Sequence, residues 1–322
     1  MSGATMGGSR RAKAALPPEP IGSGKRRFDD HFLGKLETLA ATARRISRAR
    51  AGLLRGNRRS RHVGAGLEFA DHRDYTPGDD PRHLDWNLYG RLGRLALRLY
   101  EEDEDLSIDV LVDASASMGV GRPAKLDLAL QIGAALAYVG LANLDRVAVT
   151  AFSGDDTPTL PLVRGKAAIL STLRRLETAR ASGRTALAAA VRSFLARGRG
   201  RGQRRGLVIL ISDFYDDGGH RPALDLLRHH RVDVMAVQVS APEEIAPALR
   251  GDVRVRDVET GELRDLVISP AALAAYARRR EALIRSLHGT CREREIPCFD
   301  VVSDRPFDAA VLDMFRSGGL LG

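Results

Sequence analysis

Apolar segments of strand length alternate with longer segments of helix length from residue 107 almost to the end of the chain. The apolar runs predict strands at residues 107–112, 146–152, 207–212, 232–239 and 298–302, with a short edge strand near 159–163. The segments between and after them predict helices at residues 123–142, 166–177, 185–197, 220–230, 270–288 and 307–316. Strands that are separated by helices pair in parallel through right-handed crossovers. The sequence therefore predicts an α/β fold with a doubly wound, mostly parallel sheet and helices on both faces.

Three regions are expected along the chain. Residues 1–27 are basic and rich in Gly, Pro and Ser, with too few large apolar groups to offset the entropy of ordering, so a disordered tail is predicted. Residues 28–104 form an N-terminal extension with an amphipathic helix at 29–52 and a turn-rich β segment. The α/β domain spans 105–318 and includes a hairpin that turns at Thr260-Gly261.

Charge and cysteine content narrow the class of protein. Residues 1–62 carry 15 Lys/Arg against 4 Asp/Glu, whereas the rest of the chain is nearly neutral. Such a basic arm attracts polyanions, either nucleic acid or an acidic protein, without choosing between them. Only two cysteines are present, with no histidine pattern beside them, so neither a disulfide framework nor a structural zinc site is expected. No apolar run approaches the roughly 20 residues of a membrane-spanning helix, and we expect a cytoplasmic protein without a transmembrane segment.

Oxygen-bearing side chains lie where the predicted strands end. The stretch LSIDVLVDASASMGVG, residues 106–121, places Asp113, Ser115 and Ser117 after a buried strand. Asp213 ends another strand, and Thr185 opens a helix. Asp and Ser also close ordinary turns by bonding their own backbone. However, ligands bind at the carboxyl ends of the strands in such sheets, and three separate segments bring oxygen atoms to that edge. This convergence favours a site for a hard cation, Mg²⁺ or Mn²⁺.

These residues resemble the metal-ion-dependent adhesion site of von Willebrand factor A domains. The resemblance implies that Ser115, Ser117 and Thr185 bind the ion through their hydroxyls, and that Asp113 and Asp213 hold it directly or through waters. It also implies one open coordination position, which a Glu or Asp of a partner protein fills. We expect the loops at 153–158 and 180–185, together with Phe214-Tyr215, to surround the metal.

Residues 66–118 are similar to the hallmark segment of an uncharacterised bacterial family with a von Willebrand factor A-like domain. Its members are typically encoded beside MoxR-type AAA+ ATPases. The resemblance implies a metal-dependent protein-interaction module, not an enzyme, that acts as adaptor or cofactor of such an ATPase. Within the segment, the acidic residues of 71–86 alternate with Arg73 and Arg82. We interpret this stretch as an ion-paired, turn-rich structure packed beneath Trp86, with an accessory docking surface as the alternative.

Other motifs carry weaker signals. Gly119–Ala124 matches a dinucleotide-binding pattern, but five residues separate it from the strand that it should follow at once. Ser117 with Gly119 lacks the first glycine of a nucleophile elbow. The arginine- and glycine-rich stretch 196–206 could contact RNA, but a solvated loop explains it as well. The alternative functions are nucleic-acid binding through the basic arm and, third, a hydrolase for which no acid, base or nucleophile can be named.

Overall fold

The structure, a computed structural model, describes residues 27–53, 68–77, 79–101, 107–154, 158, 160–197, 206–216, 218–230 and 232–317. The chain forms two compact units. The sheet unit comprises Met1–Ala43 and Leu106–Gly322, and the small unit comprises Arg44–Asp105. The predicted disordered tail lies outside the described residues except for Arg27, which is anchored: its side chain pairs with Asp127 at 2.6 Å.

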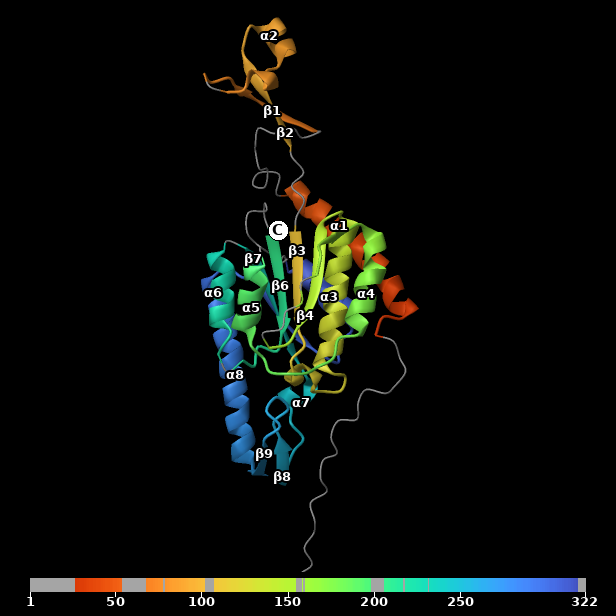
Figure 1. Cartoon of the computed structure of the whole chain (residues 1–322), viewed down its shortest axis with the longest axis vertical. Coiled ribbons are helices and arrows are strands. Elements are labelled where there is room, and N and C mark those ends of the chain that lie inside the picture. The colour runs from red at the N-terminus through yellow and green to blue at the C-terminus, as the bar shows by residue number, and fades with distance from the viewer. Residues whose placement is uncertain are drawn as a thin grey trace, which may run out of the picture. The chain divides into compact units, whose positions relative to one another are not determined.

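A six-stranded sheet forms the centre of the sheet unit, in the order β10-β7-β6-β3-β4-β5 (Figure 1). The strands are β3 (Ser107–Asp113), β4 (Arg146–Phe152), β5 (Val163–Arg164), β6 (Gly206–Ser212), β7 (Asp233–Ser240) and β10 (Cys298–Val302). All neighbouring pairs are parallel except β4 and β5, which are antiparallel. The predicted doubly wound, mostly parallel sheet is therefore confirmed.

Helices cover both faces of this sheet (Figure 1). One face carries α3 (Lys125–Ala142), α4 (Ile169–Glu177), α9 (Phe307–Arg316) and the first part of α1 (Asp30–Leu53). The other carries α5 (Leu187–Ala196), α6 (Arg221–His229) and α8 (Pro270–Glu293). Each helix buries its apolar side against strands whose side chains alternate between the two faces.

The helix α3 lies close against the sheet because glycines face it. A Cβ atom at Gly133 would lie 3.1 Å from Val112, and one at Gly140 would lie 2.8 Å from Ile108. Within the described part of the chain, α3 is also the one helix long and apolar enough to cross a membrane, and 83% of that window is buried in the fold. Its apolar character is therefore accounted for by packing against the strands on one side and α4 and α9 on the other.

The first part of α1 packs in the sheet unit through its apolar face. The rings of Phe32 and Phe307 lie 4.6 Å apart, and Leu36 is fully buried. Residues 28–43 thus belong to the sheet unit, although the sequence prediction assigned all of 28–104 to the extension. The physical reason is that an amphipathic helix needs a surface to cover its apolar side, and α9 lies nearly 280 residues later in the sequence.

Two smaller sheets complete the fold. In the sheet unit, α7 (Pro242–Ile245) leads to an antiparallel hairpin of β8 (Gly251–Arg256) and β9 (Leu263–Ile268), as the sequence predicted. In the small unit, β1 (Glu68–Asp74) pairs antiparallel with β2 (Ala96–Glu101), and α2 (Trp86–Leu92) lies between them in sequence. The prediction that Trp86 covers its neighbours is wrong: its side chain is 63% exposed.

Candidate metal centre

The three predicted hydroxyl ligands form one cluster at the carboxyl edge of the sheet. Ser115 Oγ lies 3.0 Å from Ser117 Oγ, which lies 3.4 Å from Thr185 Oγ1. Asp113 ends β3, and Asp213 directly follows the neighbouring strand β6. Residues about 70 and 100 positions apart in the chain therefore meet where the strand ends converge.

Backbone hydrogen bonds hold the threonine loop against the serine loop. Ala116 N–H donates to the Gly183 carbonyl at 3.0 Å, and Ser182 N–H donates to the Ala114 carbonyl at 2.9 Å. Gly183 has a φ of 70°, and a Cβ there would lie 2.5 Å from Ser153 Oγ. Only glycine fits this turn, because any side chain would be strained and would clash. The two loops thus form one rigid rim for the hydroxyl cluster.

Asp113 is fully buried and hydrogen-bonded on both carboxylate oxygens. Its Oδ1 accepts from Ser115 N–H at 2.8 Å, and its Oδ2 accepts from Ser212 Oγ at 2.6 Å. Burial and then the charge of Asp213 raise the pKa of Asp113 to about 6, against these hydrogen bonds, which lower it. Two buried carboxylates near each other repel, so a cation beside them would be stabilised.

Lys125 is a site residue that the sequence reasoning missed. It opens α3, is fully buried, and donates to Asp213 Oδ2 at 2.7 Å and to Glu244. Burial would lower the pKa of the ammonium, but the charges of Asp213 and Glu244 outweigh burial and the pKa is raised. A lysine in the first turn of a mostly apolar helix was the available signal. Lys125 already balances the charge of Asp213, so the site offers an ion little net negative charge.

Glu259 is a second residue that was missed. Thr185 Oγ1 donates to Glu259 Oε1 at 2.6 Å, and Thr185 N–H donates to Glu259 Oε2 at 3.2 Å. Glu259 lies in the turn of the β8–β9 hairpin, which the sequence predicted as a hairpin but did not connect with the site. No local pattern reveals this contact, since the two residues are 74 positions apart.

The predicted rim of loops is only partly right. Gly154 N–H donates to the Arg184 carbonyl at 2.9 Å, so the 153–154 and 182–184 segments do lie together beside Thr185. Residues 155–157 lie outside the described part of the chain. Phe214, by contrast, is fully buried in the apolar cluster of the sheet unit and does not border the hydroxyls. Its φ of 59° turns the backbone sharply after Asp213, and this directs the ring inward.

The chemistry of the donor set fits a hard divalent cation. Asp113, Ser115, Ser117, Thr185 and Asp213 offer oxygen atoms and no nitrogen or sulfur, which is the ligand type that Mg²⁺ and Mn²⁺ prefer. The three hydroxyls are neutral, and Lys125 offsets one of the two carboxylates. An ion at this position would keep most of its positive charge uncompensated and would attract a further anion.

Residues 71–283, more than half of the chain, match the family described as "Protein of unknown function DUF58". The chain belongs to the DUF58 family. Uncharacterized proteins of Mycobacterium tuberculosis (strain H37Rv) and Mycobacterium bovis are each 28% identical to this DUF58 chain over 303 residues, covering 91% of it and 93% of the relative.

Solved structures with a similar fold include a conserved hypothetical protein, BatB, from Bacteroides thetaiotaomicron. It is 18% identical, with a TM-score of 0.42, over 67% of this chain and 98% of that one. The VWA domain of SpRpn10 is 9% identical, with a TM-score of 0.39, over 65% and 94% of the two chains. This DUF58 protein has the α/β fold with a mostly parallel sheet that its sequence predicts.

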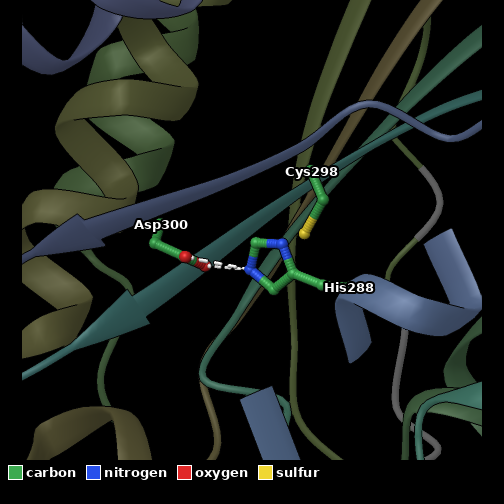
Figure 2. Close-up of side chains that lie close together, drawn as sticks. All are labelled: His288, Cys298 and Asp300. Atoms are coloured by element: carbon green, nitrogen blue, oxygen red, sulfur yellow. Dashed lines mark hydrogen bonds and ion pairs between the residues drawn. The ribbon is translucent and has the colours of Figure 1, made fainter. Parts of the chain in front are cut away.

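A second cluster of ligand-type side chains lies between α8 and β10 (Figure 2). His288 Nε2 lies 3.0 and 2.9 Å from the two oxygens of Asp300, and ligand atoms of His288, Cys298 and Asp300 all lie within 4.8 Å of one another. The sequence has no histidine pattern beside its cysteines, but the fold brings His288 beside Cys298.

This second cluster is the weaker metal candidate of the DUF58 chain. A hydrogen bond with Cys291, together with burial, raises the pKa of the Cys298 thiol far above its ordinary value. Metals bind the thiolate, and a thiol that resists deprotonation is a poor ligand. The imidazole and Asp300 already form an ion pair when His288 is protonated. The cluster therefore serves as a control for experiments on the strand-edge site.

Proposed function

We propose that this DUF58 protein is a metal-dependent protein-interaction module. Mg²⁺ or Mn²⁺ would be held by Asp113, Ser115, Ser117, Thr185 and Asp213, and the ion would bind a carboxylate of a partner protein. The observation that carries the proposal is the hydroxyl cluster, in which two serines of one loop meet a threonine of another beside the buried Asp113.

The charge of the site favours an external anion. Because Lys125 pairs with Asp213 at 2.7 Å, Asp113 is the one carboxylate among the five proposed ligands that would be left to balance a divalent ion. A partner's Glu or Asp would supply a second negative charge at short range in a partly desolvated place. An exposed ion pair by itself contributes only about 0–1 kcal/mol. The partner must therefore also contact the loops around the ion.

The partner that we propose is a MoxR-type AAA+ ATPase, for which this protein would be a cytoplasmic adaptor or cofactor. The support is the resemblance of residues 66–118 to the family whose members are encoded beside such ATPases. The role that we propose is one of binding. The basic arm that would bind nucleic acid lies largely outside the described residues, and nothing in the described part favours that alternative.

A pull-down with purified ATPase in Mg²⁺ and in chelator tests this proposal. Binding should require the ion, and Ser115→Ala and Thr185→Ala should each weaken it. Thr42→Ala is the matched control, because the Thr42 hydroxyl is exposed on α1 and donates only to its own helix, at the Thr38 carbonyl. Equal capture in chelator, or by the Ser115→Ala and Thr185→Ala double variant, would rule out a metal-dependent module.

A further inference from the structure

The carboxylate of Glu259 lies against Thr185 of the hydroxyl cluster. It accepts both the hydroxyl proton and the backbone N–H of Thr185, at 2.6 and 3.2 Å. Thr185 is one of the three hydroxyl residues of the candidate metal centre. An anion bound through two donors to a metal-site residue occupies the position that an external anion would need.

The turn of the hairpin is built to direct this side chain. Asp257 Oδ1 accepts from the N–H groups of Glu259 at 2.8 Å and Thr260 at 3.0 Å. Gly261 N–H donates to the Asp257 carbonyl at 2.8 Å, and Gly261 has a φ of 74°. These bonds fix the backbone of the turn, so the orientation of Glu259 is set before it reaches Thr185.

Glu259 is held in place while the rest of the hairpin is lightly packed. Glu259 is half-buried, whereas its neighbours in the sequence, Val258 and Thr260, are both exposed. Leu263, Leu266 and Val267 of the hairpin are also exposed. A two-stranded hairpin is marginally stable by itself. Withdrawal of the tip from the site would therefore break few contacts besides those of Glu259.

We propose that Glu259 is an internal carboxylate ligand of the metal centre, which a partner's carboxylate must displace before it can bind. The proposal rests on the function proposed above for this site. A threonine hydroxyl that binds a cation through its oxygen lone pair keeps its proton, so the bond from Thr185 to Glu259 is compatible with a bound ion. The hairpin then acts as a cover that competes with partners for the ion.

This competition lowers the apparent affinity of the partner's carboxylate by an amount that can be calculated. If Glu259 occupies the position for about 90–99% of the time, the apparent dissociation constant of any external carboxylate rises about 10- to 100-fold. A partner that also binds the exposed apolar side chains of the hairpin would relieve this inhibition, because it would favour the withdrawn state.

Mn²⁺ alone is the probe that tests the inference. At saturating Mn²⁺, the relaxation of water protons reports how many waters bind the ion. Glu259→Gln should raise this relaxation above that of wild type and lower Mn²⁺ affinity about tenfold, since site affinity follows the number of charged ligands. Glu262→Gln is the matched control in the same turn, because Glu262 pairs with Arg264 instead of the site. This control should match wild type in both measurements.

The outcomes separate this inference from the function on which it rests. Mn²⁺ that binds wild type and is lost in Asp113→Asn, with Glu259→Gln equal to wild type in affinity and water relaxation, would overturn the role of Glu259 and leave the metal site standing. Failure of wild type to bind Mn²⁺ would overturn the metal site itself. Glu259 lies in an exposed turn, so the variant should fold, and unchanged circular dichroism would verify this.

Discussion

Two acidic regions of this DUF58 protein use their carboxylates in opposite ways. In the sheet unit, Asp113 and Asp213 are fully buried, and the ammonium of Lys125 pairs with Asp213. In the small unit, Asp74 and Asp80 are exposed, Asp79 is half-buried and Asp85 is buried, and each has its own partners. Asp74 and Arg94, for example, form a pair at 2.7 Å with side chains 62% and 67% exposed. This difference shows that acidic content alone does not identify a candidate binding site. Buried carboxylates that outnumber the cations beside them are the better indication.

In the described part of the small unit, three carboxylates have local structural roles. Asp79 accepts from Thr76 N–H and from Arg73. Asp80 caps the short helical turn at Pro81–His83. Asp85 caps α2 through Asn87 N–H and Leu88 N–H and also contacts His72. The ion-paired, turn-rich interpretation of this segment agrees with these contacts, apart from the exposed Trp86, and its docking role stays a prediction.

The largest effect should come from removing the shared cation of the sheet unit. Lys125→Met leaves the buried Asp213 and the half-buried Glu244 without their shared cation, and breaking a buried pair from one side costs about 3–5 kcal/mol of the free energy of unfolding. Urea unfolding in chelator should show this loss, and Mg²⁺ should restore part of it because the ion replaces the missing charge. Lys166→Met is the control, because Lys166 and Glu37 form a solvent-exposed ion pair. Such a pair contributes at most about 1 kcal/mol to the free energy of unfolding. If Lys125→Met lowered the free energy of unfolding no more than Lys166→Met does, the contrast between the buried and the exposed ion pairs would be contradicted.

The next effect concerns the small unit. Asp85→Ala removes the carboxylate oxygen that accepts from the N–H groups of Asn87 and Leu88 at the start of α2, and the loss of such a cap costs about 0.5–2 kcal/mol. The amides of Asn87 and Leu88 should exchange hydrogen faster, by the factor that corresponds to this loss of free energy. Metal binding at the sheet unit should be unchanged, and a change there would show that the two regions are not independent.

A pH dependence distinguishes the buried acid from the exposed ones. The pKa of Asp113 is raised to about 6 in the native state, above the ordinary value of 3.8 for this carboxyl group. The native state thus holds a proton between about pH 4 and 6 that the unfolded chain releases, so the stability of the metal-free protein falls as pH rises through this window. A divalent ion binds only the deprotonated carboxylate. The rise in Tm caused by Mg²⁺ should therefore be clear at pH 7.5 and nearly absent at pH 5, and an equal rise at both would argue against Asp113 as a ligand.

The smallest effect should come from the exposed pair of the small unit. The Asp74 pKa is lowered by its hydrogen bond with Arg94, but both side chains are largely in water. Arg94→Ala should leave the Tm of the protein unchanged within error in calorimetry, and adding salt should not alter this result. A marked loss of stability would mean that this pair has a buried role that its exposure does not suggest.

The sequence predicted the parts of the site that follow from strand ends. Asp113 and Asp213 follow neighbouring parallel strands, and the sheet forces their side chains to one edge. Lys125 and Ser212 could not be assigned, because their partners come from other segments and their own residue types suit many surroundings. The contact of Glu259 with Thr185 depends on how far the β8–β9 hairpin folds back. Local periodicity in the sequence does not encode this. His288 and Cys298 meet for a similar reason, with a spacing that matches no metal-binding motif.

A titration with Mn²⁺, followed by electron paramagnetic resonance, tests the central claim most directly. Wild type should bind one Mn²⁺ that Mg²⁺ displaces. Asp113→Asn, which keeps the size of the side chain and its contact with Ser212, should abolish binding, whereas His288→Ala in the second cluster should bind as wild type does. Retention of Mn²⁺ by Asp113→Asn, or its loss in His288→Ala, would show that the strand-edge oxygens are not the metal site.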